Sequence, residues 1–376
     1  MNKSSKLLEV VFVMFRLGCI AFGGPAAHIA MLEKEIVEKR KWMSSEHFLD
    51  LIGATNLIPG PNSTEMTMHV GHERAGFLGL VFGGIAFIFP AVVITGILGW
   101  FYTEYGELPN VAPFIIGIKP AVLAIIMGAI LKLGKKALKG VEIGILGVIT
   151  FIASFLGVNE IVALLGTGLM GVFYFNVKHK ESTDKKAFLP LLLTSSPLNG
   201  IVGISTSTIF LTFLKVGAVL YGSGYVLFAY LDAELVGNGW LSRQELMDAI
   251  AIGQFTPGPV LSTATFVGFQ LGGVSGAIMA TLGIFLPSFI LVLILNPFIS
   301  KLRNSKQVGY FLDAVNIASV AIMVKVLFEM TVTSLQDWQS ITIALLSIVI
   351  TFKFKKVNSM WIILGGSILG YLLSFI

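Results

Sequence analysis

Two basic residues lie at matching places in two similar stretches of the chain. Arg16 stands in a Phe-Arg-Leu-Gly sequence, and Lys215, 199 positions later, stands in a Leu-Lys-Val-Gly sequence. A charge at the centre of a bilayer costs about 2.5–3.5 kcal/mol on insertion scales, so a cation at both equivalent positions favours a shared anionic partner. The alternative is that both side chains reach a headgroup interface. We expect Arg16 and Lys215 to bind an anion.

Helix-breaking sequences recur in the same two stretches. Gly23 and Gly24 precede a proline, and Pro59-Gly60-Pro61 returns as Pro257-Gly258-Pro259. Proline lacks an N–H and clashes with the preceding turn, whereas glycine adopts conformations that other residues avoid. A broken helix exposes N–H groups and a positive dipole end, which suit an anion. Although a packing kink is the alternative, matched breaks in two apolar halves indicate a transporter's binding site.

Matched polar side chains flank these breaks. Asn56 and Gln254 are amides three positions before each first proline, and Thr64 and Ser262 are hydroxyls just after each break. They could donate hydrogen bonds to an oxyanion or merely join neighbouring helices. The expected substrate-binding set is Arg16, Lys215, Gly23, Gly24, Asn56, Pro59, Gly60, Pro61, Asn62, Gln254, Pro257, Gly258, Pro259, Thr64 and Ser262.

Other polar residues break the symmetry between the two stretches. Lys119 has Asn316 as its counterpart, while Glu65 and His69 have no acidic or histidine equivalent. An asymmetric titratable set is what proton coupling requires, although a solvated helix end would explain it as well. Asp313 and Lys325, in an apolar segment, are candidates for ion pairs or for a transport pathway.

The composition requires a membrane environment. Hydrophobic residues make up 55% of the chain and charged residues 12%, with a mean hydropathy of +0.86, whereas soluble domains carry about a quarter charged residues. Ala249–Ser300 has no charge over 52 residues, and a helix needs roughly 20 to cross a bilayer. The sequence predicts an all-α polytopic membrane protein of about 10–12 membrane segments, including broken or re-entrant helices.

Charge distribution and cysteine count exclude several functions. The net charge of +5 comes from Lys and Arg in short loops between apolar runs, which is typical of cytoplasmic loops rather than of nucleic-acid binding. The single cysteine, Cys19, excludes an internal disulfide and a cysteine-based metal cluster. Without a Walker sequence or matched acid–base pairs, we expect no cofactor, no metal and no enzymatic activity.

The organisation is two homologous repeats, residues 1–177 and 204–376, joined by a linker at 178–203. Basic clusters such as Lys34–Lys41 read as cytoplasmic, and three loops without Lys or Arg, at 103–110, 157–160 and 331–339, read as external. The spans 75–102 and 271–299 then run in opposite directions, which predicts an inverted repeat. The odd crossing that this needs comes either from 188–203 or from a re-entrant hairpin.

The chain resembles the chromate ion transporter (CHR) family in its long form with two homologous halves. The motifs that carry the resemblance are Phe22-Gly23-Gly24-Pro25, Pro59-Gly60-Pro61-Asn62, the glycines from Gly76 to Gly83 before Pro90, and their echoes in the second half. The resemblance implies an inner-membrane carrier that exports chromate, with sulfate as a mimic because both are tetrahedral dianions. In the second half Gly222-Ser223-Gly224 replaces Gly-Gly-Pro, so the second half departs from the family motif at the position where the first half would bind the anion.

Three functions remain for the structure and the comparisons to separate. The first is a carrier for chromate-like oxyanions by alternating access, for which a negative cell interior favours export of an anion by about 2.3 kcal/mol per charge per 100 mV. The second is a proton-coupled exchanger of another anion or small metabolite. The third, which has the least support, is a membrane protein without transport activity. Lipid is an expected partner, and assembly into a homo-oligomer stays open.

Overall fold

The chain folds into helices throughout the part that can be described. The computed structural model describes residues 3–22, 24–106, 108, 112–178, 204–221, 224–295, 305–354 and 357–375, and no strand occurs within them. Five helices are long and apolar enough to cross a membrane, and four shorter apolar helices accompany them. The chain is therefore an all-α membrane protein, as predicted.

The helices follow the same order in both repeats. The first contains α1 (Lys3–Ile20), α2 (Pro25–Glu33), η1 (Lys34–Lys39), α3 (Ser45–Thr55), α4 (Asn62–Tyr105), α5 (Ala112–Ala137), α6 (Val141–Phe155) and α7 (Glu160–Lys178). The second contains α8 (Thr206–Val219), η2 (Gly224–Val226), α9 (Leu227–Leu231), η3 (Asp232–Val236), α10 (Arg243–Phe255), η4 (Val260–Ser262), α11 (Thr263–Leu295), α13 (Lys306–Ser334), α14 (Trp338–Lys353) and α15 (Ser359–Leu373).

Each repeat opens with a helical hairpin. Arg16 on α1 pairs with Glu35 on η1 at 2.7 Å, and Glu9, earlier on α1, pairs with Arg40 at 2.8 Å. Residue numbers thus run in opposite directions along the two arms, so Ala21, Phe22 and Gly24 lie at the tip. In the second repeat Lys215 on α8 pairs with Glu234 on η3 at 2.7 Å.

A second hairpin follows, with the Pro-Gly-Pro sequence at its tip. His47 near the start of α3 lies 3.7 Å from Glu73, in the first part of α4. The next residue, Arg74, pairs with Glu9 of the first hairpin at 2.9 Å. The two hairpins therefore start and end together, as re-entrant segments do. Because neither hairpin crosses the bilayer, the pair does not supply the odd crossing that an inverted repeat needs. The alternative crossing at 188–203 lies outside the described residues.

The long helices α4 and α11 each fold back sharply near their start. Gly76 has φ 67° and Gly273 has φ 60°, a conformation that favours glycine. Gly71 then meets Gly79 backbone to backbone across the turn, and Gly268 meets Gly276 in the same way. The predicted spans at 75–102 and 271–299 start at these turns, where the backbone is non-helical at Ala75 and Gly76 and at Gly272 and Gly273. A shorter helical segment, from Asn62 or Thr263, precedes each turn.

Equivalent long helices of the two repeats pack antiparallel. A methyl group added at Gly84 of α4 would lie 2.7 Å from the Phe289 ring, and one added at Gly99 would lie 3.1 Å from Phe269. As numbers rise along α4 they fall along α11. The helices α5 and α13 are also antiparallel, since Lys139, just after α5, contacts Asp313 near the start of α13 at 2.6 Å. Equivalent helices that run antiparallel through one bilayer are the geometry of an inverted repeat.

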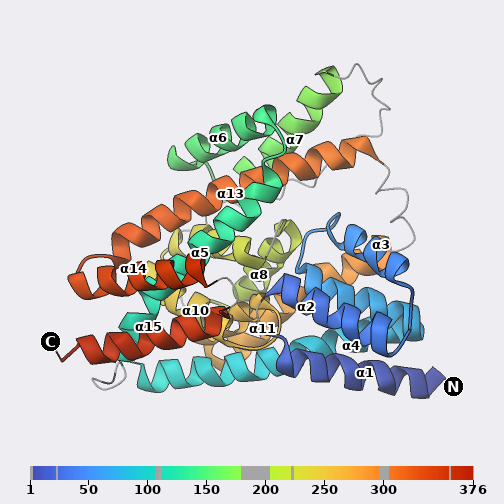
Figure 1. The fold of residues 1–376 in the computed structure, drawn as a ribbon, viewed down its shortest axis with the longest axis horizontal. Helices are drawn as coiled ribbons and strands as arrows, with labels where there is room; N and C mark the ends of the chain where they lie inside the picture. The colour runs from blue at the N-terminus through green and yellow to red at the C-terminus, as the bar shows by residue number, and fades with distance from the viewer. Residues whose placement is uncertain are drawn as a thin grey trace.

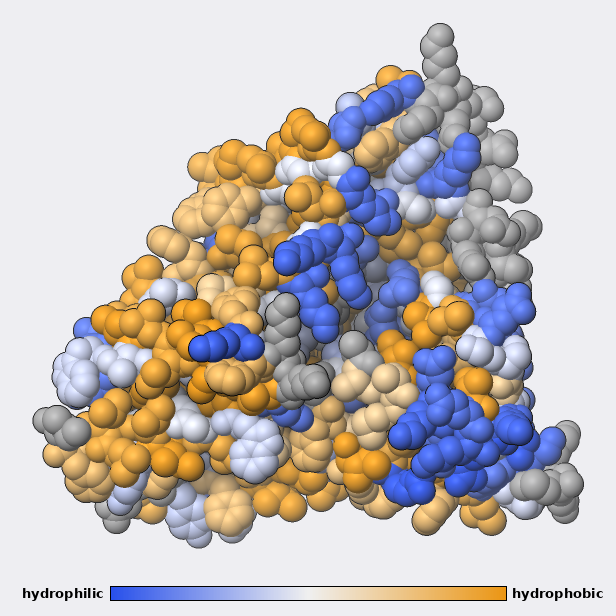
Figure 2. Space-filling model, viewed as in Figure 1, coloured by the Kyte–Doolittle hydropathy of each residue, from blue (hydrophilic) through white to orange (hydrophobic). Residues whose placement is uncertain are grey.

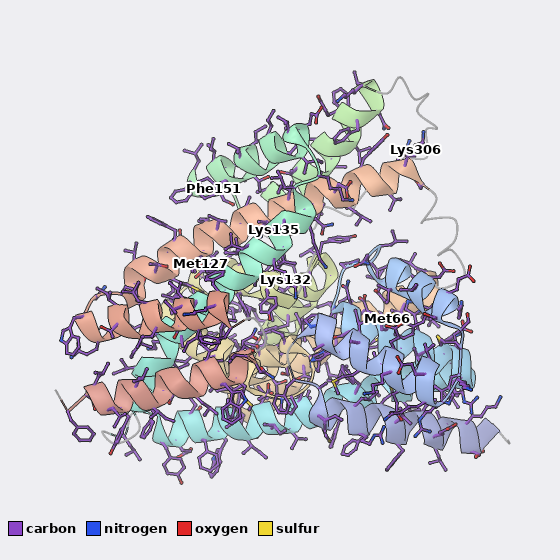
Figure 3. All side chains as sticks on the ribbon, in the orientation of Figure 1. Met66, Met127, Lys132, Lys135, Phe151 and Lys306 are labelled. Carbon is purple, nitrogen blue, oxygen red and sulfur yellow. The ribbon has the colours of Figure 1, made fainter. Side chains whose placement is uncertain are left out.

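Polar and apolar surfaces follow this arrangement. The chain's N-terminus, the end of α7 and the start of α13 lie toward one end of Figure 1, while α4, α6 and α13 finish toward the other. Lys132 and Lys135 on α5, and Lys306 on α13, mark basic positions in Figure 3. Figure 2 shows apolar side chains over α13 to α15 and hydrophilic ones over the α1–α3 region. Exposed apolar faces are what lipid contact requires.

Candidate functional site

The breaks of one repeat contact the first hairpin of the other repeat in two reciprocal hydrogen bonds. The Gly60 N–H donates to the Leu220 carbonyl at 2.7 Å, and the Gly258 N–H donates to the Ala21 carbonyl at 2.8 Å. Gly60 and Gly258 are equivalent, and so are Ala21 and Leu220. This exchange of equal contacts is what a two-fold relation produces. We call residues 21, 22, 24, 59–61, 220–221 and 257–259 the central crossing.

Both Pro-Gly-Pro glycines are required by their surroundings. Gly60 has φ 144° and Gly258 has φ 92°, within the region that favours glycine. A side chain at Gly60 would collide with Glu65 and with Ser288 of the other repeat. One at Gly258 would come within 2.8 Å of the Ala91 Cβ. Ser288 and Ala91 are themselves equivalent, so each break packs against the same place on the opposite long helix.

Three of the expected donors lie buried beside the central crossing. The hydroxyls of Thr64 and Ser262 are on residues with 0% exposure, and neither has a hydrogen-bond partner among the described residues. The Gln254 Nε2 is also without a partner in that part of the chain, on a residue 7% exposed. Burying a donor without a partner is costly, so such groups indicate a ligand or water that completes them.

The matched amide of the first repeat is placed differently. Asn56 is exposed, donates to the Ile52 carbonyl at 2.9 Å and accepts a bond from Asn62 at 2.6 Å. Asn56 and Asn62 therefore bind each other, while Gln254 is buried. The expected symmetry of the two amides does not extend to their surroundings.

The backbone at the breaks also differs from the expectation. The proline residues have no N–H, and the two glycine N–H groups already donate across the central crossing. What remains is the positive dipole end of the helices that begin there, at Asn62 and Val260. The prediction that the Pro-Gly-Pro backbone itself offers N–H groups was therefore wrong for Gly60 and Gly258.

Both predicted anion-binding cations have carboxylate partners. Arg16 pairs with Glu35 and Lys215 with Glu234, each at 2.7 Å, with side-chain exposures of 43% for Arg16 and 15% for Lys215. Glu35 and Glu234 are 199 positions apart, the same offset as their cations. That repeated spacing could have identified the acids in the sequence. An anion that binds Arg16 or Lys215 has to displace the paired carboxylate or share the cation with it.

Lys119, Asp313 and Lys325 each form an ion pair. Lys119 lies 3.5 Å from Asp248, which also accepts a 2.7 Å hydrogen bond from Tyr102. Its counterpart Asn316 is half-buried on α13. Lys325 pairs with Glu160 at 2.7 Å. Together with the Lys139–Asp313 pair described above, this confirms the ion-pair interpretation of Asp313 and Lys325.

The remaining candidate residues, Glu65, His69 and Gly24, lie in or next to the central crossing. Glu65 is 0% exposed beside Gly60, and His69 is 2% exposed one turn further along α4. Gly24, with φ 80°, lies next to the Tyr225 hydroxyl of the other repeat. Gly23 lies outside the described residues. Sequence reasoning missed Ser288 and Tyr225, because only the fold brings them to breaks in the opposite repeat.

The groups at the central crossing can form hydrogen bonds to a ligand. Hydroxyl, amide and helix-end donors can surround an anion that has several acceptor oxygens. No cluster of three or more metal-ligating side chains that could hold a metal ion occurs in the described ranges.

Comparison with known proteins identifies the family. The sequence profile described as "Chromate transporter" matches the chain twice, over residues 8–172 and 207–371. The chain belongs to the chromate transporter family. The two matches start 199 positions apart and end 199 positions apart, which is the offset that separates Arg16 from Lys215.

Individual family members cover the same length. A probable chromate transport protein of Synechococcus elongatus is 29% identical, over 97% of this chain and 95% of its own. The chromate transport protein of Cupriavidus metallidurans is 26% identical, over 97% and 92% respectively. An uncharacterized transporter of Bacillus subtilis is 28% identical over 49% of this chain but 97% of its own length, which corresponds to one repeat. No solved structure matches the chain.

Proposed function

We propose that the chain exports chromate and similar tetrahedral oxyanions, such as sulfate, across the inner membrane by alternating access. The relatives named as chromate transport proteins support the substrate class. The observation that carries the proposal is the central crossing, where two reciprocal glycine bonds lie beside the buried, unpartnered hydroxyls of Thr64 and Ser262.

The geometry suits a tetrahedral dianion. Thr64 and Ser262 each follow a break by three residues, one in each repeat, at the start of a helix whose positive dipole end faces the crossing. An oxyanion with four acceptor oxygens would receive hydrogen bonds from both repeats and from Gln254. Because these donors are neutral, their number and placement would govern selectivity. Arg16 and Lys215 would add positive charge only when Glu35 and Glu234 release them.

The two-fold relation between the repeats supports alternating access. The contacts from Gly60 to Leu220 and from Gly258 to Ala21 are equivalent, so either repeat can take the role of the other. In carriers with inverted repeats, rocking one unit against the other exposes a fixed site to each side in turn. A dianion leaving a negative interior gains roughly 4.6 kcal/mol per 100 mV, which favours export without another energy source.

The test is anion flux into inverted vesicles that contain the chain or its variants. We expect wild-type uptake of chromate, reduced by added sulfate or molybdate. Thr64→Val with Ser262→Ala should raise KM about 10-fold or more, because hydrogen bonds to a charged group contribute about 1.5–3 kcal/mol. Thr342→Val is the control, since Thr342 is half-buried on α14 and its hydroxyl donates to the Trp338 carbonyl of its own helix. Wild-type KM in the double variant would contradict this site.

A proton-coupled exchanger of another anion or small metabolite is the second candidate, and one observation favours it. Glu65 places a titratable carboxyl at the central crossing, where its counterpart in the second repeat is Thr263. Vesicles that transport a monovalent organic anion but neither chromate, sulfate nor molybdate would select this alternative.

A further inference from the structure

Glu65 differs from the other buried acids of the molecule. Glu35, Glu160, Asp232, Glu234 and Asp248 each lie within ion-pairing distance of a lysine or arginine. Glu65 is 0% exposed, and it has no ion pair within the described part of the chain. A buried carboxylate without a cation is strongly unfavourable, so such a group is held neutral or is compensated by something that binds.

The surroundings of Glu65 can serve both protonation states. Its carboxylate oxygens make no well-formed hydrogen bond to described residues, and the Ser288 hydroxyl of α11 lies beside one of them at Gly60. Tyr221, just after α8, also lies within electrostatic range of the Glu65 carboxyl. His69 lies one turn along the same helix and has contacts of its own. A hydroxyl can donate to a carboxylate or accept from a carboxylic acid, whereas none of these groups is a permanent cation.

The fold does not need an acid at this position. The equivalent residue Thr263 satisfies its hydroxyl on the Val260 carbonyl at 2.8 Å, and the counterpart of Ser288 is Ala91. The second repeat therefore builds the same break without a titratable group. This leaves a role in binding as the reason for the carboxyl in the first repeat.

We propose that Glu65 is a proton-binding site coupled to the anion site, so that a proton binds whenever the oxyanion binds. This rests on the proposed function, since the anion would lie beside Thr64, the residue that precedes Glu65. An ionised Glu65 would repel a dianion in a site that water does not screen. Each dianion then moves with one proton, and the net charge moved per turnover is one negative charge rather than two.

Because binding of the proton and binding of the anion are linked, the proposal predicts how the affinity for the anion changes with pH. Because protonated Glu65 is the form that accepts the anion, the apparent affinity for the anion rises as pH falls, by up to tenfold per pH unit while Glu65 titrates. Glu65→Gln mimics the protonated form, so its KM should not depend on pH through this group. Glu65→Thr introduces the residue that the second repeat has at the equivalent position, Thr263, and so removes the carboxyl in a second way.

The experiment uses the full chain in proteoliposomes, with sulfate as the probe because it stays a dianion where chromate protonates. Sulfate flux and proton movement are recorded together from mildly acidic to mildly alkaline pH. We expect coupled proton movement and a pH-dependent KM in wild type, and neither in the two Glu65 variants. Glu104→Gln, an exposed acid on the same helix, should behave as wild type. Unchanged proton movement in Glu65→Gln and Glu65→Thr overturns the proposal.

An infrared measurement separates this proposal from the proposed function. The carbonyl band of a protonated Glu65, assigned by its loss in Glu65→Gln, is followed with pH and with added sulfate. A band that grows with sulfate and with falling pH supports the coupled site. If wild-type vesicles carry no oxyanion, the proposed function fails. A Glu65 that stays ionised throughout, or whose band ignores sulfate, overturns the proton site whether or not flux occurs.

Discussion

At the scale of single residues, both cations predicted to bind the anion are paired with acids of their own repeat. Arg16 with Glu35 and Lys215 with Glu234 form equivalent pairs across the arms of the first hairpin in each repeat. An ion pair of this kind can neutralise a buried charge, or it can act as a latch that releases the cation to the substrate. The structure has the paired form, and the two roles make different predictions.

A double variant distinguishes these roles for Lys215. Lys215→Gln alone leaves Glu234, 8% exposed, without its cation, and breaking a buried pair in this way costs about 3–5 kcal/mol. We expect a lower Tm of the purified protein and loss of flux. Lys215→Gln with Glu234→Gln should restore the Tm. If Lys215 binds the anion, the double variant stays inactive; if it only neutralises Glu234, flux returns and the substrate role of Lys215 is excluded.

At the scale of elements, the hairpin tips are where sequence and geometry agree most closely. Every predicted break in the described residues lies at a tip or at the start of a helix beyond it, because proline and glycine act through local backbone sterics that any fold must respect. The acids Glu35 and Glu234 share the 199-residue offset of their cations in the sequence, but that they pair with Arg16 and Lys215 depends on the hairpin. The predicted spans start at the turns of Gly76 and Gly273, but the fold-back itself was not predicted, because it depends on the close contact of Gly71 with Gly79 and of Gly268 with Gly276.

The tip glycines give a prediction at this scale. Gly258→Ala would place a methyl group 2.8 Å from the Ala91 Cβ at φ 92°, a backbone conformation whose strain costs on the order of 1–3 kcal/mol. We expect a lower Tm and loss of flux. Adding Ala91→Gly removes the collision but not the strain, so it should recover only part of the Tm. Gly365→Ala, on α15 with no neighbour within 4 Å of the added carbon, is the control.

At the scale of the whole molecule, the antiparallel packing of α4 with α11 and of α5 with α13 gives the repeats opposite directions. Equivalent positions at the open ends of the hairpins should then face opposite sides of the membrane. Glu46 and Gln244 are the second residues of α3 and α10, both exposed. The basic cluster from Lys34 to Lys41 assigns Glu46 to the cytoplasm. Gln244 is accordingly assigned to the outside.

Cysteine labelling tests this assignment directly. In a chain whose single cysteine is removed by Cys19→Ser, we expect an impermeant maleimide to label Gln244→Cys in intact cells and Glu46→Cys in inverted vesicles. Both variants should react after solubilisation in detergent, which shows that each thiol is accessible. Labelling of both from one side would mean that the repeats lie parallel. The two-fold exchange of contacts at the central crossing would then relate two halves facing the same side, and rocking them could not present one site to both sides of the membrane.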